Sequence, residues 1–278
     1  VEDLDILNYR FSMLDEDLIS FLKDLAIYGF SFYFDNLKKV IQFPQKKVLT
    51  LKKFLKKVEE QSILEKNNQT YTFMNRNIHQ HFYLLTPEKK RQEKHLKFAQ
   101  TIERIKVFEN RFFLLFYHYS KTPLTTKAYI WGNRLLIDLI QKYAYHQAVD
   151  VFEQLAVFFK DIPNKEEGDF LHFFDLAQQM VNIYVFHANY DKILEILQNN
   201  ISCLMQSQQE ESLASAYMNI GRLYTLKGSI AESKKWYQKV MNLVENIKNP
   251  KILARIYEKI SMNYIFSSRF REAIKFFE

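Results

Sequence analysis

Glycine is scarce in this sequence, and the shortage restricts the possible folds more than any other feature. There are five glycines among the 278 residues. A parallel α/β nucleotide-binding fold needs glycines where its strands turn into helices, and a β-sandwich needs many Gly, Pro and Asn turns. Because 47% of the residues are hydrophobic, the chain is also too apolar to be disordered. We therefore expect an all-α fold that is dominated by a long array of helices.

The first 61 residues contain three helical patterns. Apolar residues recur at helical spacing over 14–28, and Ser12 precedes this segment as a candidate N-cap. Helices are also expected over 33–42 and 46–61, and the last one has an apolar stripe with lysines on its other faces. The stripe is formed by Val48, Leu51, Leu55 and Val58.

A small β-hairpin is expected directly after the third helix. Residues 63–65 and 71–73 read as strands, and they flank the polar turn residues 67–69. Residues 29–32 are expected to form a short turn after the first helix. Three short helices followed by a hairpin are typical of a winged helix, and from residue 76 onward every pattern is helical. We therefore expect residues 1–104 to form a winged-helix-like module with trailing helices.

The second half of the chain contains an internal repeat, in which Tyr184, Tyr224 and Tyr264 lie 40 residues apart. Small residues repeat with the tyrosines and would allow close helix packing; they are Gly221 and Ser261 in the first helix of a pair, and Ser233 and Ala273 in the second. Aromatic residues such as Tyr237 and Phe277 would fill the seams between pairs. The pattern resembles the tetratricopeptide repeat, although its period exceeds the usual ~34 residues. The resemblance implies a tetratricopeptide-like α-solenoid over residues 105–278.

Short motifs occur in a fixed order within the first 120 residues. They are Leu22-Lys-Asp-Leu-Ala-Ile-Tyr-Gly-Phe-Ser-Phe32, Leu55-x-x-Val58, Tyr71-Thr-Phe73, Tyr83-x-Leu85-x-Pro87, His95-x-x-x-Ala99 and Phe116-x-His118-Tyr119. In order and spacing they resemble the segment that follows the ATPase module in signal-transduction (STAND) ATPases, especially those of the soluble adenylyl cyclase type. The resemblance implies a non-catalytic regulatory or scaffolding segment of a larger signalling protein, which binds protein partners through its helical repeats.

The residues indicate no chemistry of the chain's own. The P-loop sequence that cradles nucleotide phosphates is absent. His79 and His81 are two apart and would point away from each other on a helix, whereas the resemblance places His95 and His118 in helix packing. Cys203 is the single cysteine, which excludes an internal disulfide and a cysteine-rich zinc site. We therefore expect no enzyme activity in this segment and assign no catalytic, cofactor-binding or metal-binding residue.

The charge leaves a second interpretation open. Thirty-nine Lys and Arg against 32 Asp and Glu give a net charge of +7. Six lysines lie on or beside the third helix, where a winged helix can contact DNA; they are Lys46, Lys47, Lys52, Lys53, Lys56 and Lys57. Base reading favours Arg, Asn and Gln, so we expect no nucleic acid partner, and a DNA-binding regulator with a repeat sensor domain stays the alternative.

A third interpretation is a purely structural repeat protein in a large assembly. The sequence starts without methionine and stops inside a helical pattern, so we expect a segment of a longer polypeptide that works within a large multiprotein complex. No apolar run approaches the ~20 residues of a membrane span, so no membrane partner is expected. A cytoplasmic location follows, and the resemblance to the cyclase family adds the cilium or axoneme as a possibility.

Overall fold

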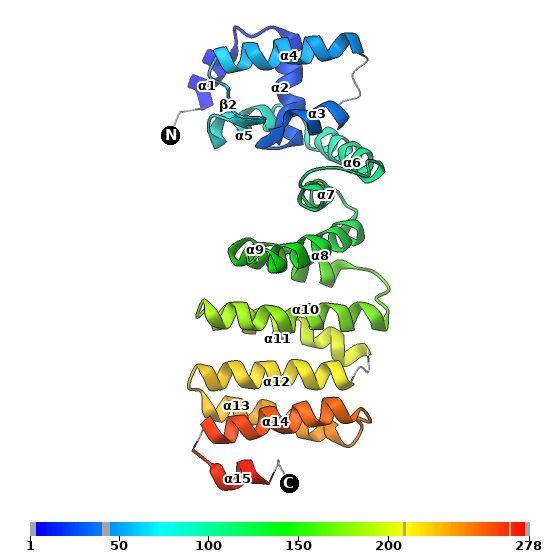
Figure 1. The fold of residues 1–278 in the computed structure, drawn as a ribbon, viewed down its shortest axis with the longest axis vertical. Coiled ribbons are helices and arrows are strands. Elements are labelled where there is room, and N and C mark those ends of the chain that lie inside the picture. Colours follow the sequence, from blue (N-terminus) through cyan, green and yellow to red (C-terminus); the bar gives the residue numbers. More distant parts are fainter. Residues whose placement is uncertain (1–3, 41–44, 208–209, 267, 276–278) are drawn as a thin grey trace. The chain divides into compact units, whose positions relative to one another are not determined.

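The computed structural model describes residues 4–40, 45–207, 210–266 and 268–275, and the chain divides into two compact units at Leu135 and Leu136. In the part of unit 1 that the structure describes, ten helices and strands precede the boundary (Figure 1). They are α1 (Leu4–Phe11), α2 (Glu16–Tyr28), β1 (Ser31–Tyr33), α3 (Phe34–Val40), α4 (Gln45–Glu60), β2 (Leu64–Asn67), β3 (Thr70–Phe73), α5 (Arg76–Leu84), α6 (Glu88–Arg104) and α7 (Arg111–Ser120).

The remaining helices follow in sequence, and α8 (Thr125–Gln141) spans the boundary. Unit 2 then contains α9 (Tyr145–Asp161), α10 (Glu167–Phe186), α11 (Tyr190–Ser207), α12 (Glu210–Leu226), α13 (Ile230–Val244), α14 (Pro250–Phe266) and α15 (Phe270–Ile274). The described residues are thus mostly helical, as expected. The domain boundary expected at 104/105 falls between α6 and α7, inside unit 1, and stays a prediction about where the repeat array begins.

The β structure is larger than the expected hairpin. Strands β2 and β3 form that hairpin, with Leu64 opposite Phe73. Residues 31 and 32 were expected in a turn, and Tyr33 was expected to begin the second helix. These three residues instead form β1, which pairs antiparallel with β3 and gives the sheet order β1-β3-β2. A strand of three residues has too little sequence to show a period of two, and its partner lies about 40 residues away in the chain.

The start of the first predicted helix also needs a correction. Its N-cap is Asp15, whose side chain accepts a hydrogen bond from the Leu18 backbone N–H, and not Ser12. Ser12 instead donates its hydroxyl to the Tyr9 carbonyl oxygen at the end of α1, a helix that the sequence did not predict. An aspartate directly before the helical residues satisfies the free N–H groups of the first turn.

Apolar side chains from the helices and the sheet form the core of unit 1. The predicted stripe on α4 is confirmed by Leu51, Leu55 and Val58, which are fully buried, whereas the Val48 side chain lies outside the described residues. The Tyr28 ring packs edge-on against Phe98, with ring centroids 5.5 Å apart. Contacts between α2 and both α5 and α6 attach the trailing helices to the core.

Unit 2 contains the expected helix pairs, α10 with α11, α12 with α13, and α14 with α15 (Figure 1). The first helices also contact one another in turn, α10 with α12 and α12 with α14. The reason for a small residue at Gly221 is visible, because a Cβ there would lie 3.0 Å from the Tyr237 ring of the paired helix. Ser233, Ser261 and Ala273 are buried, as predicted, and Phe277 lies outside the described residues.

Each first helix of a pair ends in the same left-handed turn. Ala188, Gly228 and Ser268 have φ values of 53°, 78° and 57°. In each turn the N–H of the next residue donates to the carbonyl oxygen of Tyr184, Tyr224 or Tyr264, at 3.0, 2.9 and 2.8 Å. This is the Schellman arrangement, which satisfies the last carbonyl groups of a helix. The 40-residue period of the sequence is therefore also a period of backbone conformation.

Replacing Ala188 or Ser268 with glycine is expected to raise the free energy of unfolding by up to about 1 kcal/mol. A side chain with a Cβ is strained at positive φ, whereas glycine is not. Gly228→Ala is the matched reverse change and should lower the free energy of unfolding by about the same amount. Urea denaturation of the three variants measures the effect, and a destabilised Ala188→Gly variant would contradict it.

Candidate protein-binding surface

Five side chains on the first helices of unit 2 form a surface that we call the ladder face. They are Gln178 and Asn182 of α10, Ser215 and Arg222 of α12, and Met262 of α14. Asn182, Arg222 and Met262 follow one another at intervals of 40 residues and therefore occupy the same position in successive repeats. The side chains of Asn182 and Met262 are exposed, and those of Gln178, Ser215 and Arg222 are partly exposed.

Hydrogen bonds between neighbouring repeats position the polar members of this face. The Arg222 guanidinium donates from Nη1 to Asn182 Oδ1 at 3.0 Å. The Ser215 hydroxyl approaches Gln178 Oε1 at 3.5 Å. A guanidinium has five N–H donors, so the bond to Asn182 fixes the Arg222 side chain and still leaves donors for another molecule. The ladder face thus presents a fixed cation and neutral amides to solvent.

A polar network of partly and fully buried side chains joins three helices of unit 2. The hydroxyl groups of Thr225 in α12 and Ser233 in α13 are 2.7 Å apart. Both contact Asn263 Oδ1 of α14, Ser233 at 3.3 Å and Thr225 more closely. Ser233 was predicted only as a small residue for close packing. The network was missed because it requires three side chains from different helices, which no local pattern reveals.

His79 and His81 lie in separate environments. His79 Nε2 is 2.9 Å from the Ala26 carbonyl oxygen, and the His81 ring packs against Phe11 with centroids 5.6 Å apart. Burial is the main cause that lowers the pKa of both rings. Among the described residues, no three His, Cys, Asp or Glu side chains are grouped as metal ligands would be. The Cys203 side chain lies outside the described residues.

The packing role predicted for His95 and His118 is confirmed. His95 in α6 and His118 in α7 are buried, and their Nδ1 atoms are 2.9 Å apart. His95 Nε2 is 3.2 Å from the Tyr83 hydroxyl oxygen. Burial lowers the pKa of His95 to about 4, and it lowers the pKa of His118 well below its ordinary value. Both imidazoles are therefore neutral near pH 7, and one donates its Nδ1 proton to the other.

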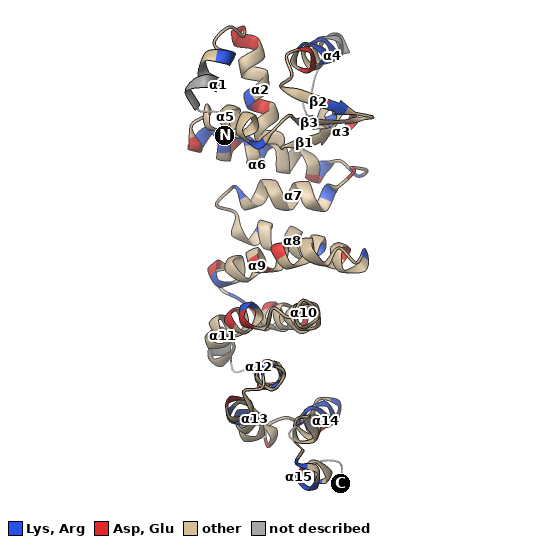
Figure 2. Ribbon diagram, turned by 90° about the vertical axis from the view of Figure 1, so that its left-hand side faces the viewer, with Lys and Arg blue, Asp and Glu red and all other residues tan. Residues whose placement is uncertain are grey.

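Four lysines of α4 have exposed side chains, and they are Lys52, Lys53, Lys56 and Lys57. Figure 2 marks both basic and acidic residues on this helix, and nearby carboxylates offset part of the lysine charge. Lys57 forms an ion pair with Asp15, and Lys56 Nζ lies 3.7 Å from Glu60 Oε1. A cavity of about 500 Å³ between α4, α3 and the hairpin is lined by three lysines and two carboxylates. They are Lys52, Lys56, Lys66, Asp35 and Glu59. The side chains of Lys46 and Lys47 lie outside the described residues.

Comparison with known proteins identifies one of the repeats. Residues 214–245 match the model of the tetratricopeptide repeat. They cover most of α12, all of α13 and the contact of Gly221 with Tyr237. The helix pairs of unit 2 are thus tetratricopeptide-like. Within the described residues, no helix is both long and apolar enough to cross a membrane.

Two solved structures resemble the chain at low sequence identity. One is a STAND protein with a tetratricopeptide repeat sensor from Pyrococcus horikoshii, with 14% identity, a TM-score of 0.37, and coverage of 99% of this chain and 47% of that one. The chain thus spans about half the length of the archaeal protein. The other is a putative kinesin light chain from Podospora anserina with nearly identical tetratricopeptide-like repeats, with 13% identity, a TM-score of 0.47, and coverage of 68% and 87%. No curated protein gives a significant match.

Proposed function

We propose that this chain is a non-catalytic regulatory or scaffolding segment of a larger signalling protein of the STAND ATPase or adenylyl cyclase type. In this proposal the ladder face binds a protein partner, and the N-terminal part is a winged-helix-like module that responds to the state of the ATPase. The element order from α2 to β3, helix, strand, two helices and two strands, supports the second part. The tetratricopeptide match supports the first, because stacked helix pairs commonly bind peptides on an extended face.

The hydrogen bond between Arg222 and Asn182 is the observation that carries this proposal. An arginine that serves only to keep the surface soluble does not need a fixed conformation, because ordering a long surface side chain lowers its conformational entropy. Here the bond orders the guanidinium at an exposed edge between two repeats. A partner then loses less entropy on binding, since the donor is already in place. The partner segment would present a carboxylate or another hydrogen-bond acceptor to Arg222.

Arg222→Glu is expected to weaken binding of the protein partner, whereas Lys234→Glu should leave that binding unchanged. Both variants change the charge by the same amount, and Lys234 is an exposed residue of α13 in the same repeat. Quantitative mass spectrometry of proteins that copurify with the chain from its own cells should show partner recovery reduced about tenfold for Arg222→Glu alone, the effect of losing one charge-assisted contact. Equal recovery with both variants would exclude the ladder face as the binding surface.

A further inference from the structure

A cavity of about 340 Å³ in unit 1 has no part in the proposed function. One wall is formed by α6, where Glu88, Arg91, Gln92 and His95 lie at the spacing of a single helical face. The rest of the lining is Tyr83 near the end of α5 and residues 120–123, which begin with the last residue of α7. This volume lies at the lower end of the range for small-molecule sites in proteins, which starts at about 300 Å³.

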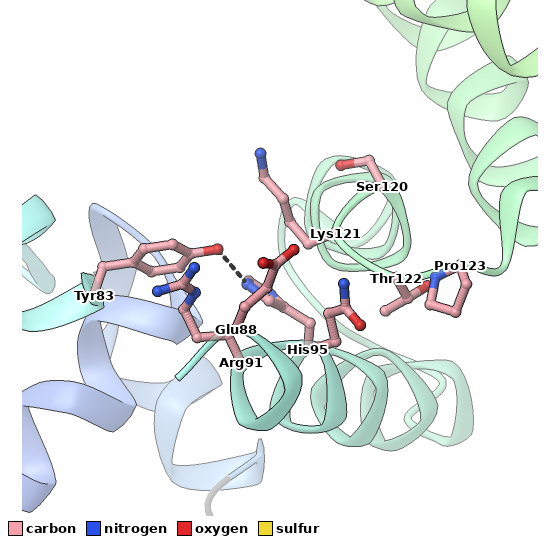
Figure 3. A pocket seen from close by; sticks show the side chains of 9 residues that line it. Tyr83, Glu88, Arg91, His95, Ser120, Lys121, Thr122 and Pro123 are labelled. Carbon is pink, nitrogen blue, oxygen red and sulfur yellow. Dashed lines mark hydrogen bonds between the residues drawn. The ribbon is translucent and has the colours of Figure 1, made fainter. Parts of the chain in front are cut away.

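The Arg91 guanidinium is held in place at this cavity. Its Nη1 donates to the Thr86 carbonyl oxygen at 2.9 Å, and its Cζ lies 4.8 Å from the centroid of the Tyr83 ring. Figure 3 shows the guanidinium beside Tyr83, whose hydroxyl is joined to His95 by the dashed line. Because one contact fixes the head group and the ring supports it, the side chain loses little entropy when its remaining N–H groups bind a ligand.

The charges and donors around the cavity select an anion. Arg91 and Lys121 are cationic and Glu88 is anionic, so the charged residues of the lining sum to one positive charge while His95 is neutral. Ser120 and Thr122 donate their hydroxyl protons to the backbone oxygens of Tyr117 and Tyr119. The donors left for a ligand are therefore those of Arg91, Lys121 and the Gln92 amide.

The buried histidine pair closes the floor of the cavity. His95 is fully buried between the cavity and His118, and its two ring nitrogens contact Tyr83 and His118. The floor is thus polar but carries no net charge near neutral pH. A ligand with several oxygen atoms can accept bonds from Arg91 and Lys121 at the walls, and it meets no buried carboxylate beneath it.

We propose that this cavity binds a small phosphorylated molecule, with Arg91 and Lys121 as the partners of its phosphoryl oxygens. A phosphoryl group has three terminal oxygens, which suit the forked guanidinium, the ammonium and the amide together. A carboxylate carries one negative charge, whereas a phosphoryl group carries about two near pH 7, so the phosphoryl group interacts more strongly with the two cations. The inference does not depend on the proposed binding of a protein partner, since every residue that it uses lies in unit 1.

Titration calorimetry of the full 278-residue chain with pyrophosphate tests this proposal. Saturable binding is expected, and it should become about tenfold weaker in Lys121→Gln and weaker again in the double variant with Arg91→Gln, because each removes a charge-assisted contact. Lys97→Gln is the matched control, since Lys97 is an exposed residue of α6 outside the cavity lining. It should bind as the unchanged chain does.

Three results would overturn the proposal. They are the absence of saturable pyrophosphate binding, an equal loss in Lys97→Gln, and tighter binding of citrate than of pyrophosphate, which would show that carboxylates are preferred. Lys121→Gln keeps the test valid if the double variant is unstable, because the Lys121 side chain is exposed. Circular dichroism melting of each variant confirms that the protein compared is folded.

Discussion

Replacing Phe173 with alanine is expected to lower the free energy of unfolding of unit 2 by about 4 kcal/mol. The Phe173 ring in α10 is 1% exposed and lies parallel to Phe159 of α9, with centroids 4.2 Å apart. It also stacks on Phe152 of α9, with centroids 5.9 Å apart. The change removes a large apolar side chain that contacts two rings, and the cavity left behind is too enclosed to collapse without a loss of stability.

Phe186→Ala is the control for this change. Phe186 is on the same helix, but it is 81% exposed, so the same truncation should alter the free energy of unfolding by less than about 0.5 kcal/mol. Urea denaturation followed by circular dichroism measures both variants. If the two phenylalanines gave equal effects, the aromatic stack would not be the main link between α9 and α10.

Acidification from pH 7 to pH 4 is expected to lower the free energy of unfolding of unit 1 by about 3 kcal/mol through protonation of His95 alone. Its pKa in the folded state is lowered to about 4 from an ordinary value of 6.5, mainly by burial and further by Lys121 and Arg91. The unfolded chain therefore takes up a proton at a pH where the folded chain does not. Stability is complete above about pH 6.5 and falls as the pH drops toward 4. Tyr83, Tyr117 and His118 are the other titratable side chains around the ring.

The comparison of His95→Gln with His172→Gln isolates this effect. Carboxylates whose pKa values are lowered by ion pairs, such as Asp15 and Glu272, lose their contributions at still lower pH and are common to all variants. His95→Gln should show a flatter dependence of the free energy of unfolding on pH between 6.5 and 4. His172→Gln changes an exposed side chain and should leave this dependence as it is in the unchanged chain. Equal slopes in the two variants would mean that His95 titrates normally in the folded protein.

Local sequence patterns predicted the features of this chain that depend on neighbours along the helix. The apolar stripe of Leu51, Leu55 and Val58 is the buried face of α4, and the small residue Gly221 is needed for contact with Tyr237. Periodicity of apolar and small residues reports directly on which face of a helix is buried. The hairpin of β2 and β3 was predicted for a similar reason, because its turn residues lie between its strands.

Features that depend on distant residues were beyond such patterns. Strand β1 exists because β3 offers it hydrogen bonds, and a short apolar run carries no signal of its own for that pairing. The contact between Arg222 and Asn182, and the cavity beside Arg91, likewise join side chains from different helices. The sequence shows such residues as ordinary polar residues on helices, so the candidate binding surfaces could be recognised only in three dimensions.

The left-handed turns at Ala188, Gly228 and Ser268 make the helix pairs of unit 2 interchangeable. The chain leaves each first helix with the same backbone geometry, and the next N–H always returns to the carbonyl of the repeated tyrosine. Joining Ala188 directly to Ser229 would excise 40 residues, which contain α11 and α12, and the Ser229 N–H would take the place of the Asn189 N–H at the Tyr184 carbonyl. The array can therefore lose or duplicate whole units of 40 residues, because each unit ends in the same turn and so leads into the next helix with the same backbone geometry.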